Sequence, residues 1–467
     1  MKKLCPSYIV YFFLLLSTYT EYAFCQAPGS LIVPDGKTPT QVHIQETGRS
    51  AINIAPPVRD GVSYNSYSQF SVDRFGVDFN NHETAARLII NEINGHLPSV
   101  IEGDIAVLGR RANFILANEN GIKIDGGTFT NMGSIALTTG RVELYDFNPA
   151  PDVSRRDALL RTNRGLIEIG GNGLTGAFNR LDLISKSIKI NGPALNTYDN
   201  AHATIRIIAG DSLAQINSNI SPADDASDWL AFRGEKTSNQ NLIVDITPLG
   251  SLSSGRIEIA VTDKGAGMRH AGEILARAGD FVLSSDGEVV FEGSQNSVAQ
   301  TTLIRAERVT MASGDSDNPT TIVSGKDVQI LAPEFHLSGV KITAGNENEE
   351  GHVIIGASDK PSQLSSSIGG IANSEGGFSL SQIQAAGSVL IGSDAQALRI
   401  TGANIEANAS IGLRGTKIDV VAASKEIAFL QLMPRVASFP LRLLMRSPLR
   451  EQSSKEEPLS ISLLRNC

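Results

Sequence analysis

Short runs of alternating apolar residues recur along most of the chain, from about residue 100 to residue 423. Similar runs lie about 20 residues apart, such as "RVTMAS" at 308–313 and "DVQILA" at 327–332, or "SVLIGS" at 388–393 and "SIGLRG" at 410–415. Alternation with a period of two predicts strands, and one coil of strands cannot bury its inward side chains alone. The sequence therefore predicts an all-β solenoid, a right-handed parallel β-helix of about 16–20 coils at the usual strand spacing.

Composition and charge narrow the classes of function. The 467 residues include 44 glycines and one tryptophan, and aromatic residues make up 6% of the chain, which suits short strands joined by turns. The formal net charge of −9 offers no basic surface for DNA, RNA or an anionic membrane. No nucleic-acid partner is expected.

The first 25 residues have the layout of a secretory signal peptide. Two lysines precede an apolar run from Tyr8 to Leu16, which is too short to cross a bilayer as a helix. Cleavage is expected after Cys25 or after Ala27, and loss of Cys25 would leave Cys467 without an internal disulfide partner. The sequence predicts a protein that is exported through the periplasm and is then secreted or displayed at the bacterial cell surface.

Two stretches interrupt the repeats, and the end of the chain departs from them. Residues 145–160 contain two prolines and are predicted to form a loop. Residues 211–241 are predicted to leave the rod, with the single tryptophan, Trp229, packing this excursion back onto the rod rather than contacting a ligand. Residues 424–467 lose glycine and alternation, which predicts a weakly ordered, non-repeat tail or the result of a truncation.

Patterns for catalysis, metals or cofactors are absent from the sequence. The histidines at 43, 82, 96, 202, 270, 336 and 352 form no pair at metal-ligand spacing, so no metal and no cofactor is expected. A polysaccharide lyase or hydrolase uses the same fold and needs carboxylates clustered on neighbouring coils. Asp182 and Glu258 lie within predicted strands and are interpreted as outward, solvated residues. The sequence predicts that the protein is not an enzyme.

Four ordered segments resemble the secreted exoproteins of two-partner secretion, typified by filamentous haemagglutinin. They are "YNSYSQFSVDRFGVDFNN" at 64–81, "AARLIINEING" at 85–95, "VLGRRANFILANENGIKIDGGTFTNMGSIALTTG" at 107–140 and "LIVDITPLGSLSSGRIEIAVTDKGAGMRHAGEI" at 242–274. The resemblance implies a secretion (haemagglutination activity) domain at 26–250 and continuing β-helix repeats at 251–423.

The resemblance also implies function and partners. It implies an adhesin that is exported through an outer-membrane transporter with periplasmic recognition domains, and whose target is a protein or glycan on a host or neighbouring cell. The alternative is the N-terminal stalk of a contact-dependent growth-inhibition toxin, which shares this region. The β-helix lyase or hydrolase is the third alternative.

One short turn carries the most specific part of the resemblance. The family has an Asn-Pro-Asn-Gly-Ile turn that is linked to recognition by the transporter, and Glu119 replaces the proline in this chain. The residues that match are Asn118, Asn120, Gly121 and Ile122. Asparagine supports turns without proline because it tolerates left-handed backbone and bonds its own main chain. The turn is therefore expected to stabilise the first coils, to contact the transporter, or both.

A second segment of the secretion domain is "ARLIINE", which contains Asn91 and Glu92. The family usually places an Asn-Pro-Asn-Leu motif before it, where this chain has Asn80 and Asn81 nearby. The resemblance implies that Asn91 and Glu92 belong to the region used in secretion.

Overall fold

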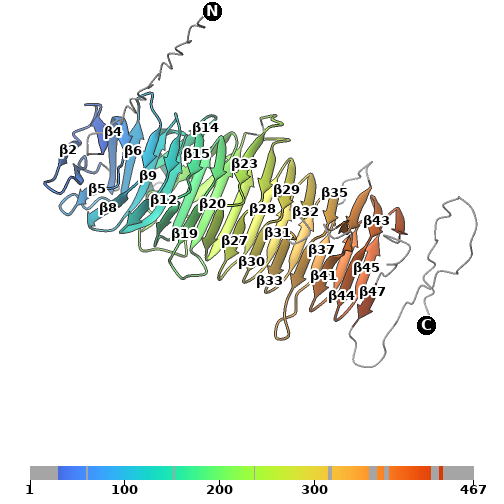
Figure 1. Cartoon of the computed structure of the whole chain (residues 1–467). Helices are drawn as coiled ribbons and strands as arrows, with labels where there is room; N and C mark the ends of the chain where they lie inside the picture. The colour runs from blue at the N-terminus through green and yellow to red at the C-terminus, as the bar shows by residue number, and fades with distance from the viewer. Residues whose placement is uncertain are drawn as a thin grey trace, which may run out of the picture.

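The computed structural model describes residues 30–58, 61–150, 153–235, 237–313, 318–356, 365–372, 378–421 and 431–434. These residues form strands β1 to β47 and no α-helix (Figure 1). Within the same residues, no helix is long and apolar enough to cross a membrane. The expected signal peptide and most of the expected tail lie outside the described residues.

Three long sheets run the length of a rod, and each coil of the chain contributes a strand to each sheet in turn (Figure 1). The first sheet has 14 strands, of which β1 is antiparallel to its neighbour and the other 13 stack in parallel. The protein is therefore a parallel β-helix, as the sequence predicted. The strands of the first sheet are β1 Leu31–Pro34, β4 Val62–Ser71, β6 Leu88–Ile93, β9 Ala112–Asn118, β12 Met132–Thr138, β17 Arg180–Ser185, β20 Thr204–Ala209, β25 Arg256–Val261, β28 Phe281–Ser285, β31 Thr302–Arg305, β34 Val328–Leu331, β37 Val353–Ile355, β42 Val389–Gly392 and β45 Ile411–Arg414.

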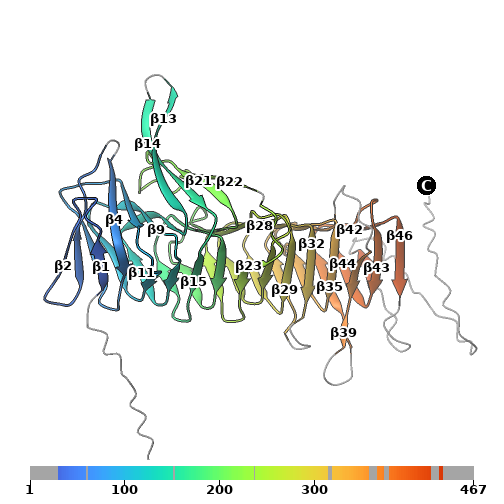
Figure 2. The same ribbon diagram turned by 90° about the horizontal axis from the view of Figure 1, so that it is seen from above.

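The second and third sheets complete the triangular coil. The second sheet comprises β7 Ser99–Ile101, β10 Ile122–Ile124, β15 Leu166–Ile169, β18 Ser187–Ile190, β23 Leu242–Ile246, β26 Gly267–His270, β29 Glu288–Glu292, β32 Arg308–Ala312, β35 Glu334–Ser338, β38 Ser366–Gly369, β43 Ala397–Thr401 and β46 Lys417–Val421. The third sheet comprises β2 Gln41–Ile44, β3 Ser50–Asn53, β5 Val77–Asn81, β8 Asp104–Gly109, β11 Gly127–Thr130, β16 Leu174–Gly176, β19 Pro193–Asn196, β24 Ser251–Ser254, β27 Glu273–Ala276, β30 Gln295–Val298, β33 Thr321–Ser324, β36 Lys341–Ala344, β41 Ser381–Ala385, β44 Ala403–Ala407 and β47 Gln431–Pro434. A short hairpin, β39 Ile371–Ala372 and β40 Phe378–Ser379, projects near the C-terminal end of the rod (Figure 2).

Coil length follows from which residues pair across neighbouring strands. Val389 pairs with Ile411, so the predicted 22-residue repeat at 388–415 is confirmed. The predicted repeat between 308–313 and 327–332 is wrong, because β32 belongs to the second sheet and β34 to the first. In the described residues the three long sheets have 14, 12 and 15 strands, fewer than the expected count of about 16–20 coils, because a coil can reach 26 residues, as from Thr302 to Val328.

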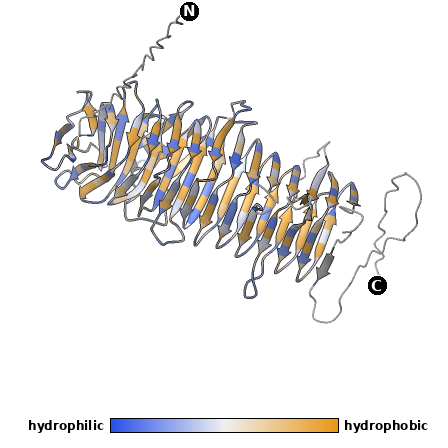
Figure 3. Cartoon of the chain, in the orientation of Figure 1, coloured by the Kyte–Doolittle hydropathy of each residue, from blue (hydrophilic) through white to orange (hydrophobic). Residues whose placement is uncertain are grey.

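The interior of the rod is one continuous hydrophobic core made mostly of aliphatic side chains. Figure 3 shows that hydrophobic residues recur on successive strands along the rod. Each inward residue of the first sheet lies over the equivalent residue of the next coil, so the coils bury one another. One such ladder consists of Leu116, Leu137, Leu183, Ile207, Ile259, Leu283, Ile304, Ile330, Ile355, Ile391 and Leu413.

A four-stranded antiparallel sheet, the excursion sheet, lies outside the rod. Its strands are β13 Arg141–Ala150, β14 Val153–Thr162, β21 Ser212–Ile216 and β22 Leu230–Gly234, paired in that order. The loop predicted at 145–160 is therefore wrong: β13 and β14 form a long hairpin that projects from the rod (Figure 2). Pro149 of β13 falls where the pairing register shifts, between Phe147 and Ala150, and a missing N–H costs little there. The predicted excursion at 211–241 is confirmed.

Trp229 packs the excursion sheet onto the rod, as predicted. Its side chain is 1% exposed, and its Nε1 donates a hydrogen bond of 2.7 Å to Oδ2 of Asp182 in β17. A second hydrophobic core lies here between the first sheet and the excursion sheet, and includes Ile184, Ile208, Leu160 and Trp229.

The expectation that Asp182 faces solvent is wrong. Asp182 does point out of the rod, but the excursion sheet covers it completely. Arg206 lies 3.6 Å from its Oδ1 and also bonds Glu258 and Asp228, so the carboxylates here form a structural charge network. Glu258 keeps partial exposure but is committed to Arg206 and Arg256. Both carboxylates are therefore held by charged or hydrogen-bonding neighbours.

The buried Asp182 predicts a specific pH dependence. Burial raises the pKa of Asp182 to about 6, and Arg206 and the Trp229 indole lower it only in part. Because the unfolded pKa is about 3.9, the folded state binds the proton more tightly. The stability contributed by this group is full below pH ~4 and is lost as the pH rises through about 6, by about 3 kcal/mol at most.

The measurement is the free energy of urea unfolding of the wild type and of Asp182→Asn from pH 4 to pH 7. Asparagine keeps an acceptor for the Trp229 indole and does not titrate. We expect the wild type to lose stability relative to the variant across this range. A difference that does not change with pH would contradict the assignment.

Candidate functional site

The Asn118–Ile122 turn joins β9 of the first sheet to β10 of the second sheet. Its first residue, Asn118, makes most of the hydrogen bonds that hold the turn in place. The Asn118 side chain is fully buried. Its Nδ2 donates to the carbonyl of Leu97 and to Oγ of Ser99, both at 3.0 Å. Its Oδ1 accepts from the backbone N–H of Asn120 at 3.0 Å, which closes the turn on itself. Asn118 therefore connects this turn to the preceding coil.

The remaining residues of the turn divide between the surface and the core. Asn120 is exposed, and its Nδ2 donates to the carbonyl of Gly95 at 2.9 Å and to Oδ1 of Asn118 at 3.0 Å. Gly121 has φ +116°, and a Cβ there would lie 3.0 Å from the carbonyl oxygen of Leu166. Only glycine fits this conformation without strain. Ile122 begins β10 and points into the core.

The structure brings the two sequence-predicted segments together. In the parallel pairing of β6 with β9, Glu92 lies beside Ala117, and Ile93 lies beside Asn118. Asn91 points into the rod and is fully buried. Its Nδ2 donates to the carbonyl of Ile115 at 3.2 Å, and its Oδ1 accepts from the Tyr67 hydroxyl at 3.2 Å. Asn91 therefore has a structural role at the N-terminal end of the aliphatic ladder.

Glu92 points out of the rod and holds the first residues of the β13–β14 hairpin. It is 9% exposed, its Oε1 accepts from the backbone N–H of Val142 at 3.1 Å, and its Oε2 accepts from the Tyr64 hydroxyl. Burial, together with Glu92, raises the pKa of Tyr64. This phenol therefore stays protonated and remains a donor to Glu92 at neutral pH.

Glu119 makes a second link from the turn to the same hairpin. Its carboxylate pairs with Arg141, at 3.3 Å, and with Arg164. Arg141 begins β13, and Arg164 follows β14, so one carboxylate joins both ends of the hairpin root. The sequence reasoning missed these arginines, because they flank a stretch interpreted as a loop and lie 22 and 45 residues from Glu119.

Two cavities lie beside this turn. The first has a volume of about 350 Å³ and lies between β6 and the start of β13, with Glu92, Glu119 and Arg141 in its wall. The second, of about 400 Å³, lies at the hairpin root and is lined by Glu119, Arg141, Glu143, Arg161, Asn163 and Arg164. We call this second cavity the arginine groove.

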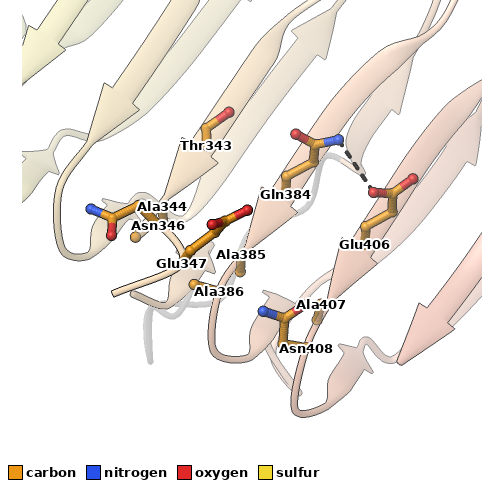
Figure 4. Close-up of a pocket in the computed structure, with 11 residues that line it drawn as sticks. Thr343, Ala344, Asn346, Glu347, Gln384, Ala385, Ala386, Glu406, Ala407 and Asn408 are labelled. Atoms are coloured by element: carbon orange, nitrogen blue, oxygen red, sulfur yellow. Dashed lines mark hydrogen bonds between the residues drawn. The ribbon is translucent and has the colours of Figure 1, made fainter. Parts of the chain in front are cut away.

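A third cavity, of about 420 Å³, lies far along the rod on the third sheet (Figure 4). Thr343, Gln384 and Glu406 occupy equivalent positions of three successive strands there, and Gln384 Nε2 donates to Glu406 Oε2 at 3.2 Å. Glu347 reaches over the cavity from the loop after β36 (Figure 4). This cavity contains no residue of either predicted motif.

In the part of the chain that is described, no group of three or more His, Cys, Asp or Glu side chains lies close enough to hold an ion. His270 is buried in the core beside Asn296, and burial lowers its pKa to about 4, so it stays neutral at physiological pH.

Comparison with known proteins gives consistent matches. A family model described as the TPS secretion domain matches residues 30–291. The chain is 30% identical over 287 residues to the tRNA nuclease CdiA-2 of Burkholderia pseudomallei (strain 1026b), which covers 57% of this chain and 8% of that protein. It is 28% identical over 276 residues to the filamentous hemagglutinin of Bordetella pertussis (strain Tohama I), which covers 55% of this chain and 7% of that protein. The chain thus spans less than a tenth of the length of these relatives.

Among solved structures, the filamentous hemagglutinin secretion domain is similar, with a TM-score of 0.49 and 23% identity. That alignment covers 70% of this chain and 99% of the other.

Proposed function

Because the chain belongs to the family of TPS (two-partner secretion) secretion domains, we propose that its β-helix directs export of an exoprotein through an outer-membrane partner transporter. The observation that carries the proposal is the family match over residues 30–291, which includes both predicted motifs. The proximity of Glu92 to the Asn118–Ile122 turn supports a single region for partner contact. The partner would meet this region with its periplasmic domains, before the chain crosses the outer membrane.

The proposed organisation follows the expected boundaries. Residues 1–25 act as a cleaved signal peptide, and residues 26–250 form the secretion domain. Residues 251–423 extend the rod, although the family match reaches residue 291. Within 424–467, four residues form β47 and pair with β44.

Two activities are proposed for the whole protein. The first is adhesion to a protein or glycan on a host or neighbouring cell, favoured by similarity to filamentous hemagglutinin. The second is service as the stalk of a contact-dependent toxin, favoured by similarity to CdiA proteins. The secretion domain itself has no catalytic role in either proposal. A glycan-cleaving enzyme is the weaker alternative, because Asp182 and Glu258 are committed to a structural network.

Export should depend on the cognate transporter. When the two proteins are co-produced, we expect the chain in the culture medium, and without the transporter we expect it in the periplasm. The measurement is the fraction of chain in medium, periplasm and cytoplasm by immunoblot. A version that lacks residues 1–25 is the control and should stay in the cytoplasm. Equal secretion with and without the transporter would refute the two-partner proposal.

A further inference from the structure

We propose that the arginine groove binds an acidic segment of the transporter's periplasmic domain, and that Glu119 occupies the groove in the free protein. This inference rests on the proposed function and adds the chemistry of the contact. The groove gathers Arg141, Arg161 and Arg164 around a cavity of about 400 Å³. The two carboxylates in its wall are Glu119 and Glu143.

The bound Glu119 shows which chemical group the groove accepts. Its carboxylate bridges the guanidinium groups of Arg141 and Arg164, which come from opposite ends of the hairpin. Planar guanidinium groups match carboxylates in geometry and charge better than lysine does. The groove is therefore already shaped for a carboxylate.

The arginines keep capacity for a further anion. Side-chain exposure is 64% for Arg141, 57% for Arg164 and 45% for Arg161, so all three remain accessible to a partner. Each guanidinium group carries five N–H donors. A single shared carboxylate therefore cannot satisfy all the donors of two guanidinium groups. Arg161 forms an ion pair with Glu235, with Nη1 and Oε1 3.0 Å apart. An incoming Asp or Glu would compete with Glu119 for these donors.

Glu119 is not needed to build the turn, which leaves it free for this role. The turn is closed by Asn118 and Asn120 through bonds that do not use the Glu119 side chain. The net charge of the chain is −9, so its overall field opposes an acidic partner, and a local cluster of arginines would give such a partner a specific point of attachment. The groove would thus determine where the partner binds relative to the Asn118–Ile122 turn.

The test measures the affinity of the purified mature chain for the soluble periplasmic domain of its transporter, at low and high salt. We expect the double variant Arg141→Glu/Arg164→Glu to bind about tenfold or more weakly at low salt, with the difference shrinking at high salt. Glu119→Gln should bind about threefold more tightly, because it removes the internal competitor. The control variant Arg305→Glu/Arg399→Glu makes the same charge change at exposed positions of β31 and β43, far from the groove, and should bind as the wild type does.

The outcomes separate the groove from the general proposal. Unchanged affinity of the arginine double variant, at an unchanged urea midpoint, would overturn the groove and leave partner-directed export standing. Weaker binding of Glu119→Gln would also overturn it, because a purely structural clamp loses affinity when its carboxylate is removed. Failure of the wild type to bind the periplasmic domain would overturn both proposals.

Discussion

Replacing Asn118 with alanine is expected to lower the free energy of unfolding by about 3 kcal/mol and to reduce export severely. The side chain is fully buried and makes bonds to Leu97, Ser99 and Asn120. Alanine leaves the buried Ser99 hydroxyl and the Asn120 N–H without this partner, and an unmade bond at a buried polar group costs about 1–3 kcal/mol. The measurements are the urea midpoint and the secreted yield in the presence of the transporter. An unchanged urea midpoint would contradict the conclusion that the hydrogen bonds of the Asn118 side chain stabilise the turn.

Asn120→Ala is the matched control that separates folding from recognition. Asn120 is exposed and adds only surface bonds to Gly95 and Asn118, so the stability loss should be about 1 kcal/mol. If the yield falls only as far as the midpoint does, the turn acts through stability. If export is blocked at a nearly unchanged midpoint, the transporter reads the Asn120 side chain.

Glu119→Pro completes the series. Asn118 ends strand β9, and the extended conformation of a strand residue is the one that proline requires before it. The variant should therefore preserve the turn, remove the carboxylate from the arginine groove, and maintain or improve export.

The repeats were predictable because each strand of a coil carries its own alternation. The spacing between Val389 and Ile411 can be recognised in the sequence, because inward positions of stacked coils require the same kind of side chain. The excursion sheet was harder to predict, because antiparallel pairing of β13 with β14 across prolines looks like a loop in sequence. A signal was nevertheless present in the rod itself. Strands β6 and β9 are buried on both faces and contain the apolar runs 88–90 and 114–117 in place of strict alternation, which indicates a second covering layer.

The candidate site was predictable in its local part and not in its long-range part. Asn118, Asn120 and Gly121 have turn chemistry that any tight corner needs, so their conformation follows from residue type. The pairing of Glu119 with Arg141 and Arg164 depends on how the hairpin returns to the rod, and no short-range pattern encodes that. The buried state of Asp182 has the same origin, since its cover comes from residue 229, which is 47 positions away.

Trp229→Ala should loosen the excursion sheet from the rod and lower stability by about 4 kcal/mol. It removes the largest side chain of the second core and also the indole donor to Asp182, which is buried and would keep only the Arg206 contact. Trp229→Phe keeps most of the side-chain volume but removes the indole N–H. Its smaller loss of stability, about 1–2 kcal/mol, would therefore measure the cost of losing the hydrogen bond to Asp182. The difference between the two variants measures packing alone.

The effect of Trp229→Ala should also be local. Coils of a solenoid contact only their neighbours, so the distal strands do not depend on the excursion sheet. Hydrogen exchange should rise in β13, β14, β21 and β22 and stay unchanged from β28 to β42. If the second core instead holds the whole rod, exchange would rise evenly along all coils. Local loosening would displace Arg141 and Arg164 from Glu119 without unfolding the turn. Transporter binding should therefore weaken even though the distal coils stay as stable as in the wild type.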